Sequence, residues 1–174
     1  MKDFTTTKLT SGFSLLEIMV TVAIIGMLAT LAVPAIREAT QNAQVMRTVS
    51  DMRQYSSAIS TYNLANGEYP EDKTPGEMPE GMEEIMPPQW LAAAPVGGSW
   101  DWDYEQFGTK AAVSIYADNA LTPKTIYSWY RIDKTLDDGF LGAGLVRIRP
   151  GGLMFVIDEG SGGGSIFGSN GTGG

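Results

Sequence analysis

The sequence predicts an α+β fold in which one long N-terminal helix packs on a small antiparallel sheet. The first part of the chain reads as a helix that continues to about Asn63, before the stop signal Asn66-Gly67. The later part contains short stretches in which apolar and polar residues alternate, and turn residues separate them. A helix followed by a run of strands is typical of α+β proteins.

The composition excludes several classes of function. The 174 residues include 12 Lys and Arg against 20 Asp and Glu, and this net charge of −8 argues against nucleic-acid binding. There is no Cys and no His, which removes thiol nucleophiles, imidazole bases and Cys/His zinc sites. No pair of carboxylates is singled out for glycosidase chemistry, and we predict that the chain is not an enzyme.

An apolar run from Phe13 to Val33 is long enough to cross a membrane. Its polar side chains are Glu17 and a few small hydroxyl residues. As a helix it would measure about 30 Å, the thickness of the hydrocarbon core. Lys2 and Lys8 precede it and favour a cytoplasmic N-terminus. We therefore predict a single-pass protein whose transmembrane half-helix covers residues 13–34 and whose C-terminal domain lies outside the cytoplasm.

The acid near the start of this run leaves three interpretations open. A secretory signal cut after Thr30-Leu31-Ala32 would be longer than usual and would give Glu17 no purpose. An uncleaved anchor would tolerate Glu17 close to the membrane surface. In the third interpretation the chain is cut after Gly12, and Glu17 becomes the fifth residue of the processed protein.

The stretch Ser11-Gly12-Phe13-Ser14-Leu15-Leu16-Glu17 resembles the processing site of type IV prepilins and type II secretion pseudopilins. In that family a short basic leader ends in Gly, the next residue is often Phe, and Glu is fifth after the cut. The resemblance extends to Gly26 and Pro34, at positions where many pilins have Gly and Pro. It implies that residues 1–12 are a leader. It also implies that a prepilin peptidase cuts between Gly12 and Phe13 and methylates the new amine of Phe13.

The resemblance gives Glu17 a role in assembly. Its carboxylate can pair with the Phe13 amine of a neighbouring subunit, an amine that exists only after cleavage. The pairing would offset the cost of a charge at bilayer depth and would fix the axial register of the subunits. Gly26 and Pro34 weaken the helix between them. The resemblance implies that this segment partly unwinds in a filament, and a static kink is the alternative.

Residues 35–64 are predicted to form the amphipathic half of the helix. Apolar side chains recur mostly at steps of three and four residues and form one stripe. The members of the stripe are Ile36, Ala39, Ala43, Val45, Val49, Met52, Ser56, Ile59 and Tyr62. We expect the stripe to pack under a globular head.

The head is predicted over residues 65–159, and a flexible Gly/Ser-rich tail follows at 160–174. The Pro-rich part before residue 99 indicates loops, with helical turns around 81–86 and 89–93. Strands are expected at 99–107, 111–117, 125–132, 145–148 and 153–158. Turns are expected at Asp118-Asn119, Asp138-Gly139 and Pro150-Gly151-Gly152.

One acidic stretch of the head alternates with aromatic residues, Trp100-Asp101-Trp102-Asp103-Tyr104. The alternation predicts a strand whose aromatic side chains face inward and whose acids face outward. The alternative is a carbohydrate- or metal-binding edge, because such edges combine aromatic faces with acids.

A second acidic stretch contains Asp133, Asp137 and Asp138. These carboxylates could supply hard oxygen ligands to Ca²⁺, the one cofactor that the sequence suggests. Major pseudopilins commonly carry a Ca²⁺ site in a loop of the C-terminal sheet, so the resemblance supports this interpretation. The alternative is that Asp137 and Asp138 accept hydrogen bonds from nearby backbone amides in a turn before Gly139.

The resemblance implies a structural subunit of a type IV pilus-like or type II secretion filament. Such a subunit is stored in the bacterial inner membrane and then becomes part of a periplasmic or surface filament. The implied partners are a prepilin peptidase, further copies of the chain or related pilin-like subunits, and assembly platform proteins. The lack of cysteines departs from the C-terminal disulfide loop of many pilins and favours a pseudopilin for protein secretion. The alternatives are a surface pilin for adhesion, motility or DNA uptake, and a secreted monomeric binding module.

Overall fold

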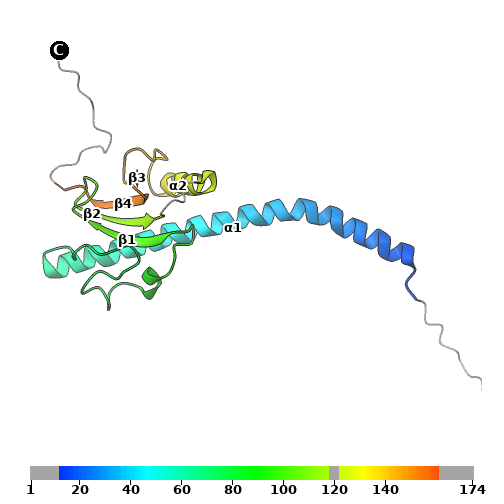
Figure 1. Ribbon diagram of the computed structural model, residues 1–174, viewed down its shortest axis with the longest axis horizontal. Coiled ribbons are helices and arrows are strands. Elements are labelled where there is room, and N and C mark those ends of the chain that lie inside the picture. The colour runs from blue at the N-terminus through cyan, green and yellow to red at the C-terminus, as the bar shows by residue number, and fades with distance from the viewer. Residues whose placement is uncertain (1–11, 118–121, 161–174) are drawn as a thin grey trace, which may run out of the picture. The chain divides into compact units, whose positions relative to one another are not determined.

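The computed structural model describes residues 12–117 and 122–160, so residues 1–11 of the expected leader, the turn at Asp118-Asn119 and most of the tail lie outside the described residues. The chain divides into two compact units between Thr40 and Gln41. The elements in chain order are helix α1 (Leu15–Asn66), the short 3₁₀ helix η1 (Pro88–Leu91), strands β1 (Ser99–Tyr104) and β2 (Ala111–Tyr116), helix α2 (Pro123–Leu136), and strands β3 (Val146–Arg149) and β4 (Gly152–Asp158) (Figure 1). The predicted α+β fold is confirmed, and α1 ends at Asn66 rather than near Asn63.

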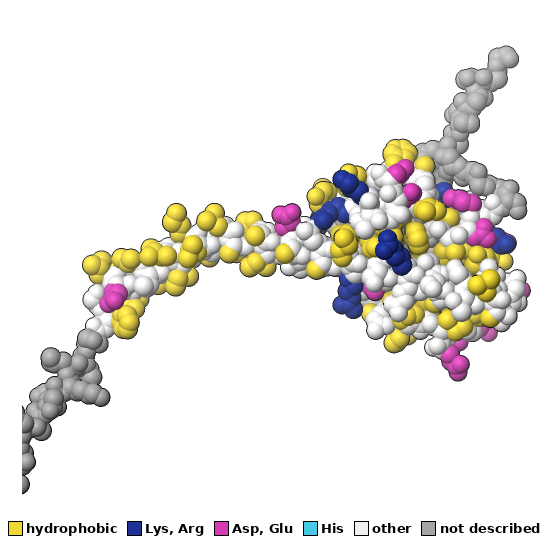
Figure 2. Space-filling model, turned by 180° about the vertical axis from the view of Figure 1, so that it is seen from behind, with side chains coloured by type: hydrophobic (Ala, Val, Ile, Leu, Met, Phe, Trp, Pro, Cys, Tyr) yellow, Lys and Arg dark blue, Asp and Glu magenta, His cyan; other side chains and the backbone are white. Residues whose placement is uncertain are grey.

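The described part of the first unit is the N-terminal portion of α1. Its apolar side chains, such as Leu15, Ile25 and Leu31, are exposed to the surroundings (Figure 2). By length and composition, α1 is the one helix within the described residues that could cross a membrane, with a mean hydropathy of 2.3 in its most apolar window. Pro34 lies inside α1, which continues through it.

In the second unit, α1 buries one side against the sheet. Four members of the predicted stripe are buried, and three further residues share their side of the helix. The buried residues are Val45, Thr48, Val49, Met52, Tyr55, Ala58 and Ile59. Ile36, Ala39 and Ala43 are exposed, because burial of α1 begins only at Val45.

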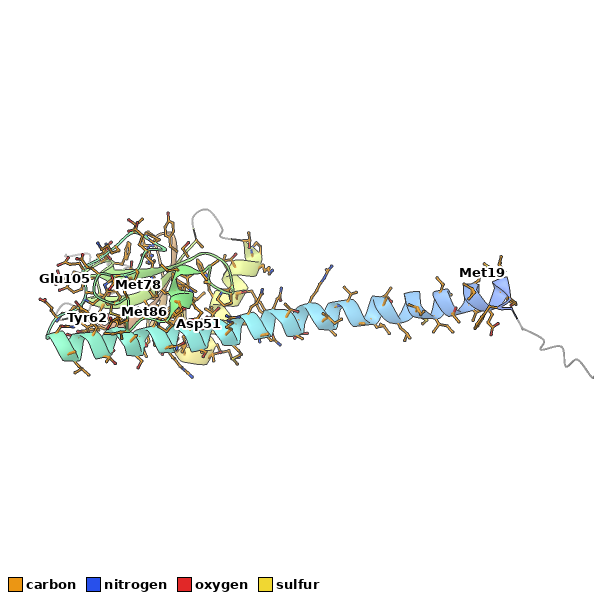
Figure 3. The ribbon with its side chains drawn as sticks, turned by 90° about the horizontal axis from the view of Figure 1, so that it is seen from below. Met19, Asp51, Tyr62, Met78, Met86 and Glu105 are labelled. Carbon is orange, nitrogen blue, oxygen red and sulfur yellow. The ribbon has the colours of Figure 1, made fainter. Side chains whose placement is uncertain are left out.

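Aromatic side chains form the centre of this core. The Tyr55 ring lies edge-on to Trp90 and Trp100, at centroid distances of 5.1 Å and 4.9 Å. Trp90 is in η1, where a helical turn was predicted. The Pro-rich segment also contributes Met86 to the core, and Met78 and Tyr62 pack against the core on the same side (Figure 3). Loop, helix and sheet therefore share one hydrophobic cluster.

The four strands form one antiparallel sheet in the order β1-β2-β4-β3. The predicted strands at 99–107, 111–117, 145–148 and 153–158 are confirmed with small differences in their bounds. Gly151 has a φ of 75° in the β3–β4 turn, a conformation that glycine adopts without strain.

Loops cover both outer strands of this sheet. On β1, the Trp100 carbonyl accepts a hydrogen bond from the Gly76 N–H at 2.7 Å. On β3, the Ile148 N–H donates to the Leu141 carbonyl at 2.9 Å. Part of the hydrogen-bonding capacity of each edge is therefore used within the chain.

The strand predicted at 125–132 is wrong, because this segment belongs to α2, which lies beside β3 (Figure 1). The Thr122 side chain caps the helix by accepting a hydrogen bond from the Thr125 N–H at 3.1 Å, and Pro123 follows at the start of the helix. Trp129, Ile132 and their helical neighbours are buried at steps of three and four residues. The aromatic residues of this segment favour a strand by propensity, but their burial follows the helical period.

The two faces of the sheet differ in chemistry. Trp100 and Trp102 face the core, as predicted. Asp101 and Asp103 point to the opposite face and are only 5% and 2% exposed, so the prediction that they face solvent is wrong. The reason is Arg149 of β3, which reaches across the sheet. Its Nη2 donates a hydrogen bond to Asp101, and its Nε lies 3.0 Å from Asp103 Oδ2.

This buried group has more negative than positive charge. Burial raises the pKa of Asp101 to about 7, the charge of Asp103 adds to the rise, and Arg149 opposes it. Burial also raises the pKa of Asp103, against the charge of Arg149 and the hydrogen bond donated by the Ser114 hydroxyl. Arg149 is therefore the cation on which both buried carboxylates depend.

Replacing Arg149 should reveal this dependence. We expect Arg149→Met to lower the free energy of unfolding by about 3–5 kcal/mol, because two buried carboxylates lose their cation. Lys110→Met is the matched control, since Lys110 lies 4.0 Å from Asp158 in a half-exposed pair and its loss should cost about 0–1 kcal/mol. Urea unfolding of the full chain in detergent, followed by tryptophan fluorescence, measures both. Equal losses for the two variants would contradict the dependence.

Candidate functional site

The predicted cleavage site lies in exposed, non-helical chain just before α1. Phe13 is 78% exposed, and neither Gly12 nor Phe13 is helical. A Cβ added to Gly12 would meet no atom within 4 Å, so the fold itself does not require a glycine there. A peptidase that must approach the backbone closely would require one. The Gly12–Phe13 bond is therefore exposed and lies outside α1.

Ser14 starts the helix, a role that the sequence analysis missed. The Glu17 N–H donates both to the Ser14 Oγ at 3.2 Å and to the Ser14 carbonyl at 3.1 Å, and the Ile18 N–H donates to the same carbonyl at 3.3 Å. Glu17 is the third helical residue, so Ser14 and Glu17 have the spacing of a capping box. The carboxylate also lies near the positive end of the helix dipole. The position of Glu17 therefore stabilises the start of α1 independently of any contact with another subunit.

Hydroxyl groups inside the apolar run find partners within α1. The Thr21 hydroxyl donates to the Ile18 carbonyl at 2.9 Å, and the Thr30 hydroxyl donates to the Met27 carbonyl at 2.7 Å. A polar group in hydrocarbon needs such an internal partner. A Cβ on Gly26 would meet nothing within 4 Å, so no contact among the described residues explains that glycine.

The three acids Asp133, Asp137 and Asp138 come together at the end of α2. Each offers a carboxylate oxygen, and these oxygens lie within 4.8 Å of one another. Asp137 and Asp138 accept hydrogen bonds from the backbone amides of Leu145 and Phe140, as expected for turn acids. Both interpretations of this stretch are therefore compatible with the geometry.

Asp133 differs from its two neighbours. It is fully buried, and neither of its carboxylate oxygens has a hydrogen-bond partner of good geometry among the described residues. Burial raises the pKa of Asp133 to about 6, the Gly139 backbone N–H opposes the rise, and the charges of Asp138 and Asp137 add to it. A buried carboxylate without a well-formed hydrogen bond is costly, and a cation that all three acids share would offset that cost.

An accessible Gly-Phe bond before a helix of membrane length, joined to a small α+β head, defines the pilin-like class of membrane-anchored proteins. A family model described as the prokaryotic N-terminal methylation motif matches residues 8–33. The type II secretion system core protein G of Pseudomonas aeruginosa is 31% identical over 122 residues, which cover 62% of this chain and 81% of that protein. The chain belongs to the type IV pilin and type II secretion pseudopilin family.

Other relatives match over shorter lengths. The type IV major pilin protein PilE1 of Neisseria gonorrhoeae is 39% identical over 66 residues, 38% of this chain and 40% of that pilin. The type II secretion system core protein G of Aeromonas hydrophila is 42% identical over 60 residues, 34% of this chain and 42% of that protein. The chain thus spans about two fifths of the length of these relatives. No solved structure matches the chain.

The cap at Ser14 can be tested by hydrogen exchange. In Ser14→Ala we expect the Glu17 amide to exchange about fivefold faster, because loss of an N-cap costs about 1 kcal/mol. Amide exchange of the full chain in detergent micelles measures this by NMR. Ser14→Thr retains a hydroxyl acceptor and should exchange like the unchanged chain. Unchanged exchange in Ser14→Ala would exclude the capping role.

Proposed function

We propose that the chain is a structural subunit of a type II secretion pseudopilus. The observation that carries this proposal is the alignment with core protein G of Pseudomonas aeruginosa, because it extends over 81% of that protein and 62% of this chain, well beyond the N-terminal motif. The absence of cysteines supports the same assignment. Pilins and pseudopilins are structural proteins, and the chain would itself be the substrate of the processing reaction.

Processing would prepare the helix for assembly. A prepilin peptidase cuts between Gly12 and Phe13, removes Lys2 and Lys8 with the leader, and methylates the new amine. The processed subunit is held in the inner membrane by residues 13–34, with its head outside the cytoplasm. Assembly platform proteins then bring subunits together, and the exposed apolar side chains of α1 become buried between helices.

Glu17 would direct this step. In low dielectric its carboxylate pairs with the Phe13 amine of the next subunit, and each charge offsets the desolvation cost of the other. The capping geometry at Ser14 supports the proposal, because it holds Glu17 in the first turn of α1. Gly26 and Pro34 would allow α1 to adapt when helices pack, either by partial unwinding or as a static kink.

We also propose that Asp133, Asp137 and Asp138 hold Ca²⁺. The support is the approach of their oxygens to within 4.8 Å and the lack of a partner for the buried Asp133. The ion would join the end of α2 to the chain that follows it and so order this part of the head.

A surface type IV pilin is the second candidate function. The 39% identity with PilE1 of Neisseria gonorrhoeae favours it, but the alignment covers only 66 residues. Such a pilin would serve adhesion, motility or DNA uptake. A secreted monomeric module is less well supported, since it would require a cut after Ala32 within α1.

The N-terminus of the purified protein separates these interpretations. We expect Edman sequencing and mass spectrometry of protein coexpressed with a prepilin peptidase to begin at a methylated Phe13. In Glu17→Val we expect the same N-terminus and normal membrane insertion, but at least about tenfold less filament, because the Phe13 amine stays unpaired in low dielectric.

Glu38→Val is the matched control, since it removes an exposed acid farther along α1. This variant should assemble normally. An N-terminus at Val33 would indicate a secretory signal, and one at Met1 an uncleaved anchor. Normal incorporation of Glu17→Val into sheared filaments would exclude the pairing.

The calcium proposal predicts a metal-dependent melting temperature. We expect millimolar Ca²⁺ to raise the melting temperature of the full chain in detergent by roughly 5 °C or more relative to EGTA, because a ligand at about 100 times its Kd stabilises by about 2.7 kcal/mol. Asp137→Asn should lose most of this shift, whereas Glu84→Gln, a charge change in an exposed loop, should retain it. No difference between Ca²⁺ and EGTA would exclude the site.

A further inference from the structure

A cavity of about 490 Å³ opens on the face of the sheet that α1 does not cover. Asp101 and Asp103 of β1 and Arg149 of β3 line it, together with Tyr116 of β2. The segments around Asp72 and Phe107 add further walls. Its volume is in the range of ligand pockets. Neither processing, membrane insertion nor the calcium proposal uses this cavity.

The buried part of the cavity lining has more acidic than basic side chains. Asp101, Asp103 and Arg149 are each at most 5% exposed, so two buried carboxylates share one guanidinium. At the rim, the Asp72 carboxylate accepts hydrogen bonds from the Tyr104 N–H and the Gln106 side chain, which are neutral donors. The rim therefore adds no cation to the buried group through these contacts, and the lining remains short of positive charge.

Lys73, the other cation of the lining, is directed elsewhere. Its Nζ lies 3.4 Å from Glu80, an exposed acid outside the cavity. Arg149 is held in place, because its Nη1 donates to the Pro150 carbonyl at 3.2 Å and its Nη2 donates to Asp101. Neither cation is thus free to neutralise the remaining buried charge.

Aromatic side chains already hold a guanidinium in this cavity. The Arg149 guanidinium carbon lies 4.8 Å from the centre of the Phe107 ring and 5.7 Å from that of Tyr116. Aromatic faces attract organic cations. Ionised carboxylates accept strong hydrogen bonds from the N–H groups of such cations. The lining therefore has the chemistry of a cation site of which one position is filled by the chain itself.

We propose that this cavity binds an organic cation, the ammonium or guanidinium group of a lysine or arginine side chain that another protein presents. The incoming cation would bond Asp101 and supply the positive charge that Arg149 alone does not provide. The raised pKa of Asp101 has the same cause, the burial of its carboxyl group beside Asp103. The cavity lies on the side of the sheet opposite the side that packs against α1.

A metal ion fits this cavity less well than an organic cation. Within the described residues, the one group of three acids whose oxygens come within 4.8 Å of one another is Asp133, Asp137 and Asp138. The acids of the cavity therefore do not form a compact oxygen ligand set. A flexible side chain can instead enter the cavity and bond one carboxylate at a time.

The test compares a cation with its neutral isostere. N-acetyl-arginine amide and N-acetyl-citrulline amide are titrated into the full chain in detergent micelles, and binding is followed by NMR. We expect arginine amide to bind at least about tenfold more tightly than citrulline amide, because hydrogen bonds between charged groups are stronger than those between a charged and a neutral group. Equal binding of the two compounds would overturn the proposal.

Asp101→Asn removes the excess charge and retains a hydrogen-bond acceptor for Arg149. This variant should fold with an unchanged or higher melting temperature. Its ratio of affinities for arginine amide and citrulline amide should fall at least about tenfold. Glu71→Gln makes the same charge change at an exposed position outside the cavity lining, and it should bind like the unchanged chain. An undiminished preference in Asp101→Asn would overturn the proposal even if the arginine amide binds.

The source of the cation is determined by a second measurement. If another copy of this chain presents the side chain, Asp101→Asn should also reduce cross-linking between heads in assembled filaments. If a different protein presents it, Asp101→Asn should assemble like the unchanged chain and still lose the arginine amide preference. Both results support the cation site, and they assign it to different partners.

Discussion

The second unit depends on one packing interaction, the burial of a single side of α1 under the tryptophan face of the sheet. Val45, Met52 and Ile59 supply the aliphatic part of this contact, and Tyr55 places its ring edge-on to Trp90 and Trp100. The apolar face of a four-stranded sheet is unfavourable in water, and α1 stabilises the sheet by covering this face. The same helix begins as an apolar run whose side chains are exposed along residues 15–33. The sequence of α1 therefore changes in character along its length, from a segment that is apolar and exposed to a segment that buries one side against the sheet.

Much of the fold could be predicted because its signals are local. Helix length, the stripe around Val49 and the strand bounds follow from periodicity and turn residues. The α2 segment was mistaken for a strand because its aromatic residues favour strands, whereas Thr122 and Pro123 carried the correct signal of a helix start. Reading that cap before the alternation would have identified the helix.

The buried charges could not have been predicted in the same way. Asp101 and Arg149 are 48 residues apart in the chain, and only the strand order β1-β2-β4-β3 places both on one face. The alternation of aromatic and acidic residues correctly assigns the side chains of β1 to two faces. It contains no information about which side chains of other strands cover the acidic face. The residues that resemble a prepilin processing site, in contrast, lie within one short stretch of the chain, and this resemblance could be recognised without knowledge of the fold. In the candidate metal site, the three acids were visible in the sequence, but the lack of a partner for Asp133 depends on how α2 packs.

The loops along both outer strands have a consequence for crowded surroundings. A filament holds many heads at high local concentration, and an open strand edge would invite one sheet to extend into the next. Here the Trp100 carbonyl and the Ile148 N–H are already bonded to Gly76 and Leu141 of the same chain. Part of the backbone of each edge is thereby withdrawn from pairing with another strand, which disfavours the extension of one sheet into the next. In the filament that we propose, contacts between heads would therefore rely more on side chains than on backbone pairing.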